Sequence, residues 1–232
     1  MQEGAQMTQQ KTSKKMDDFL STRLDKYTAW LDDRKIAYSA KIVPVKASLE
    51  NKQWILPTEQ VLEIIASATT IALTDCVCRG HYKRCDRPVD VCLLLNQYGR
   101  KCIDKGRGRE ISLDEAAGVL DKANRQGLVH LSLYRPDHQL YALCSCCSCC
   151  CHDLQLLLDY KQDNLVVHSD YAARTDMDQC IHCGDCIARC AFQARNLEDD
   201  VMVYNPDNCY GCGLCVSTCP VGATVMKRKQ PA

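Results

Sequence analysis

The chain has 232 residues, of which 46% are hydrophobic, and a formal net charge of zero, so it has room for one medium-sized core and one small domain. Its 19 cysteines would suit a secreted disulfide scaffold, but residues 1–15 lack the apolar segment of a signal peptide, and no apolar stretch reaches the roughly 18 residues that cross a bilayer. We therefore expect a cytoplasmic protein of an oxygen-poor host, with no membrane span and with thiols that bind metal or carry redox chemistry.

Ordinary secondary-structure patterns precede the first cysteines. Residues 1–15 are polar and predict a disordered tail. Apolar residues recur every three or four positions from 17 to 36, which predicts an amphipathic helix. A second helical pattern opens at Pro57 and Thr58, and residues 70–74 predict a short buried strand or turn that leads into the cysteines.

A first group of cysteines follows this segment. Pro88 stands at the predicted first turn of a helix that holds residues 91–95. Basic residues lie between the cysteines, where they would balance the excess negative charge of a metal centre bound by thiolates. The cysteines are Cys76, Cys78, Cys85 and Cys92, and the basic residues are Arg79, Lys83, Arg84 and Arg87.

A helix and a hairpin are predicted next. Ser112 and Glu115 form a capping box that begins a helix ending near Gly127, and two apolar runs, 128–134 and 139–143, then predict a hairpin. This order resembles the end of a winged-helix module. The helix has more acidic than basic residues, so we expect a scaffold that delivers the following cysteines, and no nucleic-acid partner.

The second group packs six cysteines into eight residues. Adjacent side chains diverge in a strand or a helix, so these thiols cannot all reach one cubane cluster. The group consists of Cys144, Cys146, Cys147, Cys149, Cys150 and Cys151.

The two groups together predict an iron–sulfur site in the N-terminal part of the chain. With Cys102 they hold enough thiols for one or two further clusters, either cubanes or an enlarged non-cubane cluster, and zinc is the alternative metal. His81 and His152 could replace a ligand, but with thiols in surplus we expect them to be exposed or to donate hydrogen bonds. The pairing of the groups is similar to that in uncharacterised cysteine-rich ferredoxin-type proteins of anaerobes, which implies no specific reaction.

A helix and an extended linker are predicted after the second group. Residues 153–160 contain four leucines and predict a helix that covers the cysteine-rich core. Residues 166–171 predict the linker, and we expect the domain boundary near residues 162–169.

Two further cysteine runs repeat each other at an offset of 29 residues. In such a run three thiolates bind three corners of one [4Fe–4S] cluster, while the fourth binds the cluster of the other run. Asp178, Gly184 and Ala194 also recur at this offset, which indicates a duplicated unit. The runs are Cys180, Cys183, Cys186 and Cys190, and Cys209, Cys212, Cys215 and Cys219.

Residues 174–226 resemble bacterial two-cluster ferredoxins. The resemblance implies a ferredoxin-like fold with two [4Fe–4S] clusters. Ala191 stands where these ferredoxins usually carry proline, so we expect that end of the first loop to be less rigid. The implied ligands are Cys180, Cys183, Cys186 and Cys219 for the first cluster, and Cys209, Cys212, Cys215 and Cys190 for the second.

We thus predict an α+β protein with a cysteine-rich domain at 16–165, containing the winged-helix-like helix and hairpin, and a two-cluster ferredoxin domain at 166–232. Acidic residues between 176 and 207 could steer a basic partner. No nucleotide-binding or nucleophile motif is present, and no catalytic residue is identified.

Electron transfer is therefore the expected function, relaying low-potential electrons to a redox protein or enzyme subunit. Two alternatives stay open. One is an iron–sulfur reductase with a catalytic N-terminal centre, and the other is an iron–sulfur-sensing winged-helix regulator.

Overall fold

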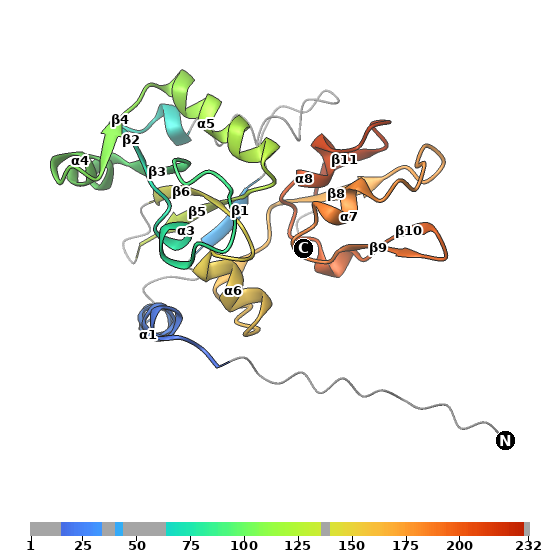
Figure 1. Cartoon of the computed structure of the whole chain (residues 1–232), viewed down its shortest axis with the longest axis horizontal. Coiled ribbons are helices and arrows are strands. Elements are labelled where there is room, and N and C mark those ends of the chain that lie inside the picture. The colour runs from blue at the N-terminus through green and yellow to red at the C-terminus, as the bar shows by residue number, and fades with distance from the viewer. Residues whose placement is uncertain (1–14, 34–39, 44–63, 136–139, 230–232) are drawn as a thin grey trace.

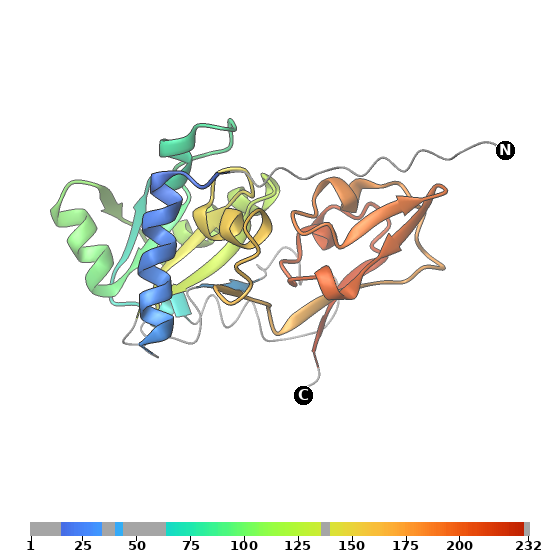
Figure 2. The same ribbon diagram turned by 90° about the horizontal axis from the view of Figure 1, so that it is seen from below.

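A computed structural model describes residues 15–33, 40–43, 64–135 and 140–229. Figures 1 and 2 show two lobes, a larger one built on a sheet with helices and a smaller C-terminal one of short strands and helices. This mixture of helices and strands agrees with the predicted α+β class.

The larger lobe contains a seven-stranded sheet in the order β4-β2-β3-β6-β5-β1-β7. Its neighbouring strands are antiparallel, except for the parallel pair of β1 and β7. The strands are β1 (Ala40–Val43), β2 (Ile71–Thr74), β3 (Cys92–Leu95), β4 (Gly108–Glu110), β5 (Val129–Tyr134), β6 (Leu140–Cys146) and β7 (Val166–Val167).

Several predicted helices are present. Asp17 caps α1, and the Ser112 side chain accepts a hydrogen bond from the Glu115 N–H at the start of α5, as the capping box predicts. Residues 57–63 of the helix predicted to begin at Pro57 lie outside the described part of the chain. The helices of this lobe include α1 (Asp18–Asp32), α3 (Val77–Tyr82), α4 (Asn96–Asp104), α5 (Leu113–Arg125) and α6 (His152–Leu158).

The prediction of a helix at residues 91–95 is wrong, because this segment forms strand β3. Leu93 and Leu95 are fully buried, and β3 lies between β2 and β6 in the sheet. A short apolar run covered on both sides satisfies its backbone hydrogen bonds through two neighbouring strands, and it is too short for a stable helix. Pro88 therefore precedes a strand.

The hairpin predicted after α5 is present as β5 and β6. Both strands lie inside the sheet, since β1 pairs with the outer edge of β5 and β3 pairs with that of β6. Strand β6 ends at Cys146 and so carries the chain from the sheet into the second cysteine group.

The smaller lobe consists of two similar halves. Helices α7 and α8 begin after Gly184 and Gly213, which lie 29 residues apart and both have a positive φ near 80°. This agreement supports the duplicated unit that the repeat indicates. The elements are β8 (Tyr171–Thr175) paired with β11 (Thr224–Arg228), β9 (Arg195–Glu198) paired with β10 (Val201–Tyr204), α7 (Asp185–Ala188), the 3-10 helix η2 (Pro206–Asn208) and α8 (Leu214–Ser217).

The two lobes share apolar packing. One buried cluster joins Leu154 and Leu156 of α6 to Phe192 and Leu214 of the smaller lobe. Strand β7, which falls inside the predicted second domain, belongs to the sheet of the larger lobe. The chain therefore crosses between the lobes after β7.

Candidate metal centres

The four cysteines implied for the first cluster surround one small cavity in the smaller lobe. Three of them precede or enter α7, and Cys219 follows α8. His182 also lines this cavity, and its Nδ1 accepts a hydrogen bond from the Met202 N–H at 3.0 Å. Cys183 is exposed. The complete set is Cys180, Cys183, Cys186 and Cys219, which we call the first quartet.

The four cysteines implied for the second cluster surround a separate cavity. Gly211 shapes its wall, because at φ 72° an added Cβ would lie 1.9 Å from the Tyr171 carbonyl oxygen. Burial raises the pKa of Cys215 to about 11, so metal binding at this thiol would have to release a proton. The second quartet is Cys209, Cys212, Cys215 and Cys190.

A buried arginine lies between the two quartets. Arg195 is 3% exposed, and its Nη1 lies 3.9 Å from Cys186 Sγ and donates to Thr175 Oγ1 at 2.8 Å. Burial lowers the pKa of Arg195, but the neighbouring thiols of Cys215 and Cys186 outweigh this effect and raise it. A guanidinium in this position would balance the negative charge of metal-bound thiolates on both sides.

A compact third quartet lies in the larger lobe. The Sγ atoms of Cys85, Cys147, Cys149 and Cys150 all lie within 4.8 Å of one another. Cys85 Sγ and Cys147 Sγ are 3.8 Å apart, as are those of Cys149 and Cys150. Four converging thiols are a donor set that could hold a metal ion. We call these four residues the N-terminal quartet.

The other cysteines predicted as ligands lie close to it. Cys76 and Cys92 are buried in the same apolar cluster as Cys147 and Cys150. Cys102 lies apart on α4, where its Sγ faces Gly108. The structure thus gathers all ten candidate cysteines in one region and leaves out Cys102; the remaining four are Cys78, Cys144, Cys146 and Cys151.

The two histidines considered as ligands have different surroundings. His81 is exposed and stacks on Phe19, with ring centroids 4.4 Å apart. His152 is buried, and its ring hydrogen-bonds with Cys78 Sγ at 3.0 Å and with the Tyr27 hydroxyl at 2.8 Å. Burial lowers the pKa of His152. The sequence analysis did not identify Tyr27 as a residue of this site. Its position on the apolar face of α1 was a signal, because a buried tyrosine hydroxyl usually needs a hydrogen-bond partner.

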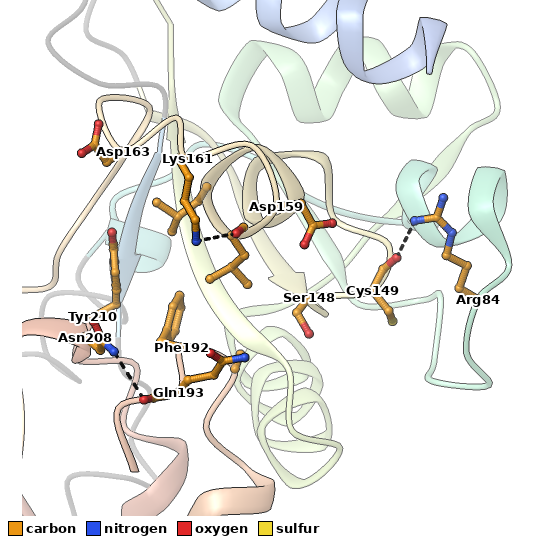
Figure 3. Close-up of a pocket in the computed structure, with 13 residues that line it drawn as sticks. Arg84, Ser148, Cys149, Asp159, Lys161, Asp163, Phe192, Gln193, Asn208 and Tyr210 are labelled. Atoms are coloured by element: carbon orange, nitrogen blue, oxygen red, sulfur yellow. Dashed lines mark hydrogen bonds between the residues drawn. The ribbon is translucent and has the colours of Figure 1, made fainter. Parts of the chain in front are cut away.

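A cleft of about 700 Å³ is lined by Cys149 of the N-terminal quartet and by residues of the smaller lobe that adjoin the second quartet, including Ala191, Asn208 and Tyr210. Figure 3 shows Cys149 and Arg84 at one end and Phe192, Gln193 and Tyr210 from the smaller lobe at the other. Its size is that of a small-molecule site. Sequence reasoning missed this cleft, because its walls come from segments that are far apart in the chain.

Comparison with known proteins identifies part of this arrangement. Residues 173–226 match the family model of the 4Fe-4S dicluster domain. No match is found among curated proteins. The match supports a ferredoxin-type C-terminal region, and with the cysteine-rich larger lobe it supports iron–sulfur cluster binding and suggests electron transfer. Across the described part of the chain, no helix has the length and apolar character to cross a membrane.

Proposed function

We propose that this chain relays low-potential electrons through several iron–sulfur clusters to a partner redox enzyme. One [4Fe–4S] cluster would be held by the first quartet and one by the second, and the N-terminal cysteines would hold at least one further centre. Such clusters supply one-electron exchange at low potential when bound. The protein residues set which centre meets the partner and how the centres are connected.

The observation that carries this proposal is the unequal exposure of the two ferredoxin-type quartets. Cys183 of the first quartet is exposed, and Ile181 and Val221, which line the same cavity, are 59% and 43% exposed. By contrast, Cys209 and Cys212 are buried. The first quartet is thus suited to exchange electrons with a partner, and the second to pass them within the molecule.

The surface near the first quartet suits a basic partner. Leu197 lies beside Gly184 of the first loop and is exposed, as is Val201 across the β9–β10 turn. Acidic residues in the same lobe are exposed as well. A surface with an apolar centre and an acidic rim can bury apolar area against a partner and attract a basic partner electrostatically. The exposed acids include Asp176, Glu198, Asp199 and Asp200.

The second quartet is held against the larger lobe by Arg189, the residue before Cys190. Its Nη1 and Nη2 donate to the carbonyl oxygens of Arg125 and Asn124, at 2.9 and 3.1 Å. These carbonyls belong to the last turn of α5, where the helix leaves acceptors without intrahelical partners. The contact would keep the second quartet at a fixed position relative to the N-terminal cysteines.

Anaerobic stopped-flow spectroscopy tests the proposal. Reduced protein should pass electrons to a basic redox acceptor such as cytochrome c, and the rate should fall as salt screens charges over about 8–10 Å. The double change of Asp199→Asn and Asp200→Asn should slow the reaction and weaken its salt dependence. Asp114→Asn, an exposed acid of the larger lobe, is the matched control. Absence of transfer to any redox protein would refute the relay.

A catalytic N-terminal centre is the second candidate, and the cleft lined by Cys149 favours it. Here a small polar molecule in the cleft would take electrons without a partner protein. The test is substrate-dependent reoxidation of the reduced chain alone, with Lys161→Ala changing the cleft wall. The regulator interpretation gains no such support, because Lys122 and Arg125 of α5 are paired with Asp90 and Asp121.

A further inference from the structure

Six of the ten candidate cysteines in the larger lobe lie outside the N-terminal quartet and pack in or against two adjoining buried clusters. The side chain of Cys76 interacts with those of Cys78 and Cys92, and all three are buried in one apolar cluster. Cys92 in turn contacts Cys144. The set, which we call the six-thiol group, is Cys76, Cys78, Cys92, Cys144, Cys146 and Cys151.

The remaining contacts close this group around the start of α6. The side chain of Cys151, the residue before α6, interacts with those of Cys78 and Cys146. Cys146 also lies close enough to Cys144, Cys78 and Cys76 for electrostatic interaction with their side chains. The six thiols therefore form one connected group.

The sheet explains why the strand cysteines converge. Leu93 of β3 pairs with Leu143 of β6 in an antiparallel register, and one step further along places Cys92 beside Cys144. Cys144 and Cys146 are two residues apart on β6, so both side chains point to the same face. Cys147 begins the turn beyond the strand and belongs to the quartet instead.

A buried cation lies against this group, and among the described residues it has no carboxylate partner. Arg79 is 2% exposed, and its backbone N–H donates to Cys76 Sγ at 3.5 Å. Its Nη1 donates to the Ser145 carbonyl oxygen at 3.0 Å and to Cys147 Sγ at 3.7 Å. Within the described residues its Nε and Nη2 have no partner. A buried guanidinium among neutral thiols is costly, whereas metal-bound thiolates would balance its charge.

The smaller lobe has the same arrangement. Arg195 is buried between Cys186 of the first quartet and Cys215 of the second. The Arg79 guanidinium contacts Cys147 of the N-terminal quartet, its backbone N–H contacts Cys76 of the six-thiol group, and the charges of both thiols raise the pKa of its guanidinium. In each lobe, one buried arginine thus lies between two sets of thiols.

We propose that the six-thiol group holds a second N-terminal iron–sulfur centre, separate from the N-terminal quartet, with the Arg79 guanidinium between the two. A cubane offers four iron corners to thiolates, so six protein thiolates call for a larger centre. His152, whose ring contacts Cys78 Sγ, orients one of these ligands.

Metal analysis of the full-length chain, reconstituted anaerobically, tests this proposal. Iron and sulfide would be counted and Mössbauer and EPR spectra recorded for three variants. The first combines Cys92→Ala with Cys144→Ala, the second combines Cys85→Ala with Cys149→Ala, and Cys102→Ala is the matched control. We expect the first two variants to lose different spectral components, while the control keeps all of its iron.

Loss of the same components from both double variants would show a single N-terminal centre and overturn the proposal. So would full retention of iron in the Cys92→Ala, Cys144→Ala variant. If that variant does not fold, the unmodified chain decides. Three cubanes and a larger centre together contain more than about sixteen irons per chain. A measured count of sixteen or fewer would therefore contradict a six-ligand centre. Either failure leaves the partner-dependent relay through the first and second quartets intact.

Discussion

Replacing Arg79 should affect stability in the metal-free chain and reduction potential in the loaded chain. In the metal-free chain the buried Arg79 side chain donates to the Ser145 carbonyl and to the Cys147 thiol, and no carboxylate partner lies among the described residues, so Arg79→Met should increase the free energy of unfolding. In the loaded chain the same change should lower the reduction potential of the N-terminal centres, because a nearby cation stabilises their more negative reduced state.

Denaturant unfolding of the metal-free protein and EPR-monitored redox titration of the loaded protein measure these effects. Arg79→Lys is the control, since it keeps the charge but loses the forked donors. Unchanged potentials in the methionine variant would contradict the position of Arg79 between two metal centres.

His130 provides a pH-dependent contribution to stability. It is fully buried in β5 beside Ser145, and burial lowers its pKa from 6.5 to about 3. The folded chain keeps this histidine neutral, while the unfolded chain protonates it below about pH 6.5. Its stabilisation is therefore complete above that pH and falls by about 1.4 kcal/mol per pH unit from there toward pH 3.

Comparing the protein with His130→Gln isolates this effect from that of other groups. Denaturant unfolding between pH 7.5 and 5.0 should show a shallower decline for the variant. Equal slopes would mean that His130 is protonated in the folded state.

At the scale of elements, the loops before α7 and α8 position the ferredoxin-type quartets. Gly211 and Gly222 both have a positive φ, but an added Cβ would collide with the Tyr171 carbonyl at Gly211 and would meet nothing at Gly222. Gly211→Ala should therefore remove about four irons by distorting the loop of the second quartet. Gly222→Ala is the matched control, which should keep them. Iron counting with EPR checks both, and equal iron content would contradict this role of Gly211.

Elements also show where pattern reasoning works and where it does not. The capping box at Ser112 and the helical spacing of α1 are local signals, and the predictions from them are confirmed. Residues 91–95 were predicted as a helix because Pro88 suits a first helical turn. Their strand conformation depends on β2 and β6, which lie outside that window.

For the whole molecule, the division into two independently loaded parts is testable. Cys180→Ala and Cys209→Ala should each remove one ferredoxin-type cluster and leave the N-terminal centres spectroscopically intact. The reason is that the first and second quartets surround separate cavities within the smaller lobe. EPR and Mössbauer spectra of the reduced variants check this. Loss of every cluster signal from either variant would show that the two lobes load their metal as one unit.

The ferredoxin-type region could be predicted from the chain without its fold. Cysteines separated by two residues meet within one tight loop, so local geometry brings them together. The repeat at an offset of 29 residues indicates which second run supplies the fourth ligand of each cluster. Long-range structure is needed only to bring the fourth cysteine of each run to the other loop.

The N-terminal cysteines could not be sorted in this way. Cys146 and Cys147 are adjacent in sequence, yet one joins the six-thiol group and the other the N-terminal quartet, because the strand ends between them. Their partners, such as Cys85 and Cys92, are more than fifty residues away. Strand register and the order of strands in the sheet decide which thiols meet. Both depend on packing between segments that are far apart in the sequence, so they cannot be predicted from the local spacing of the cysteines.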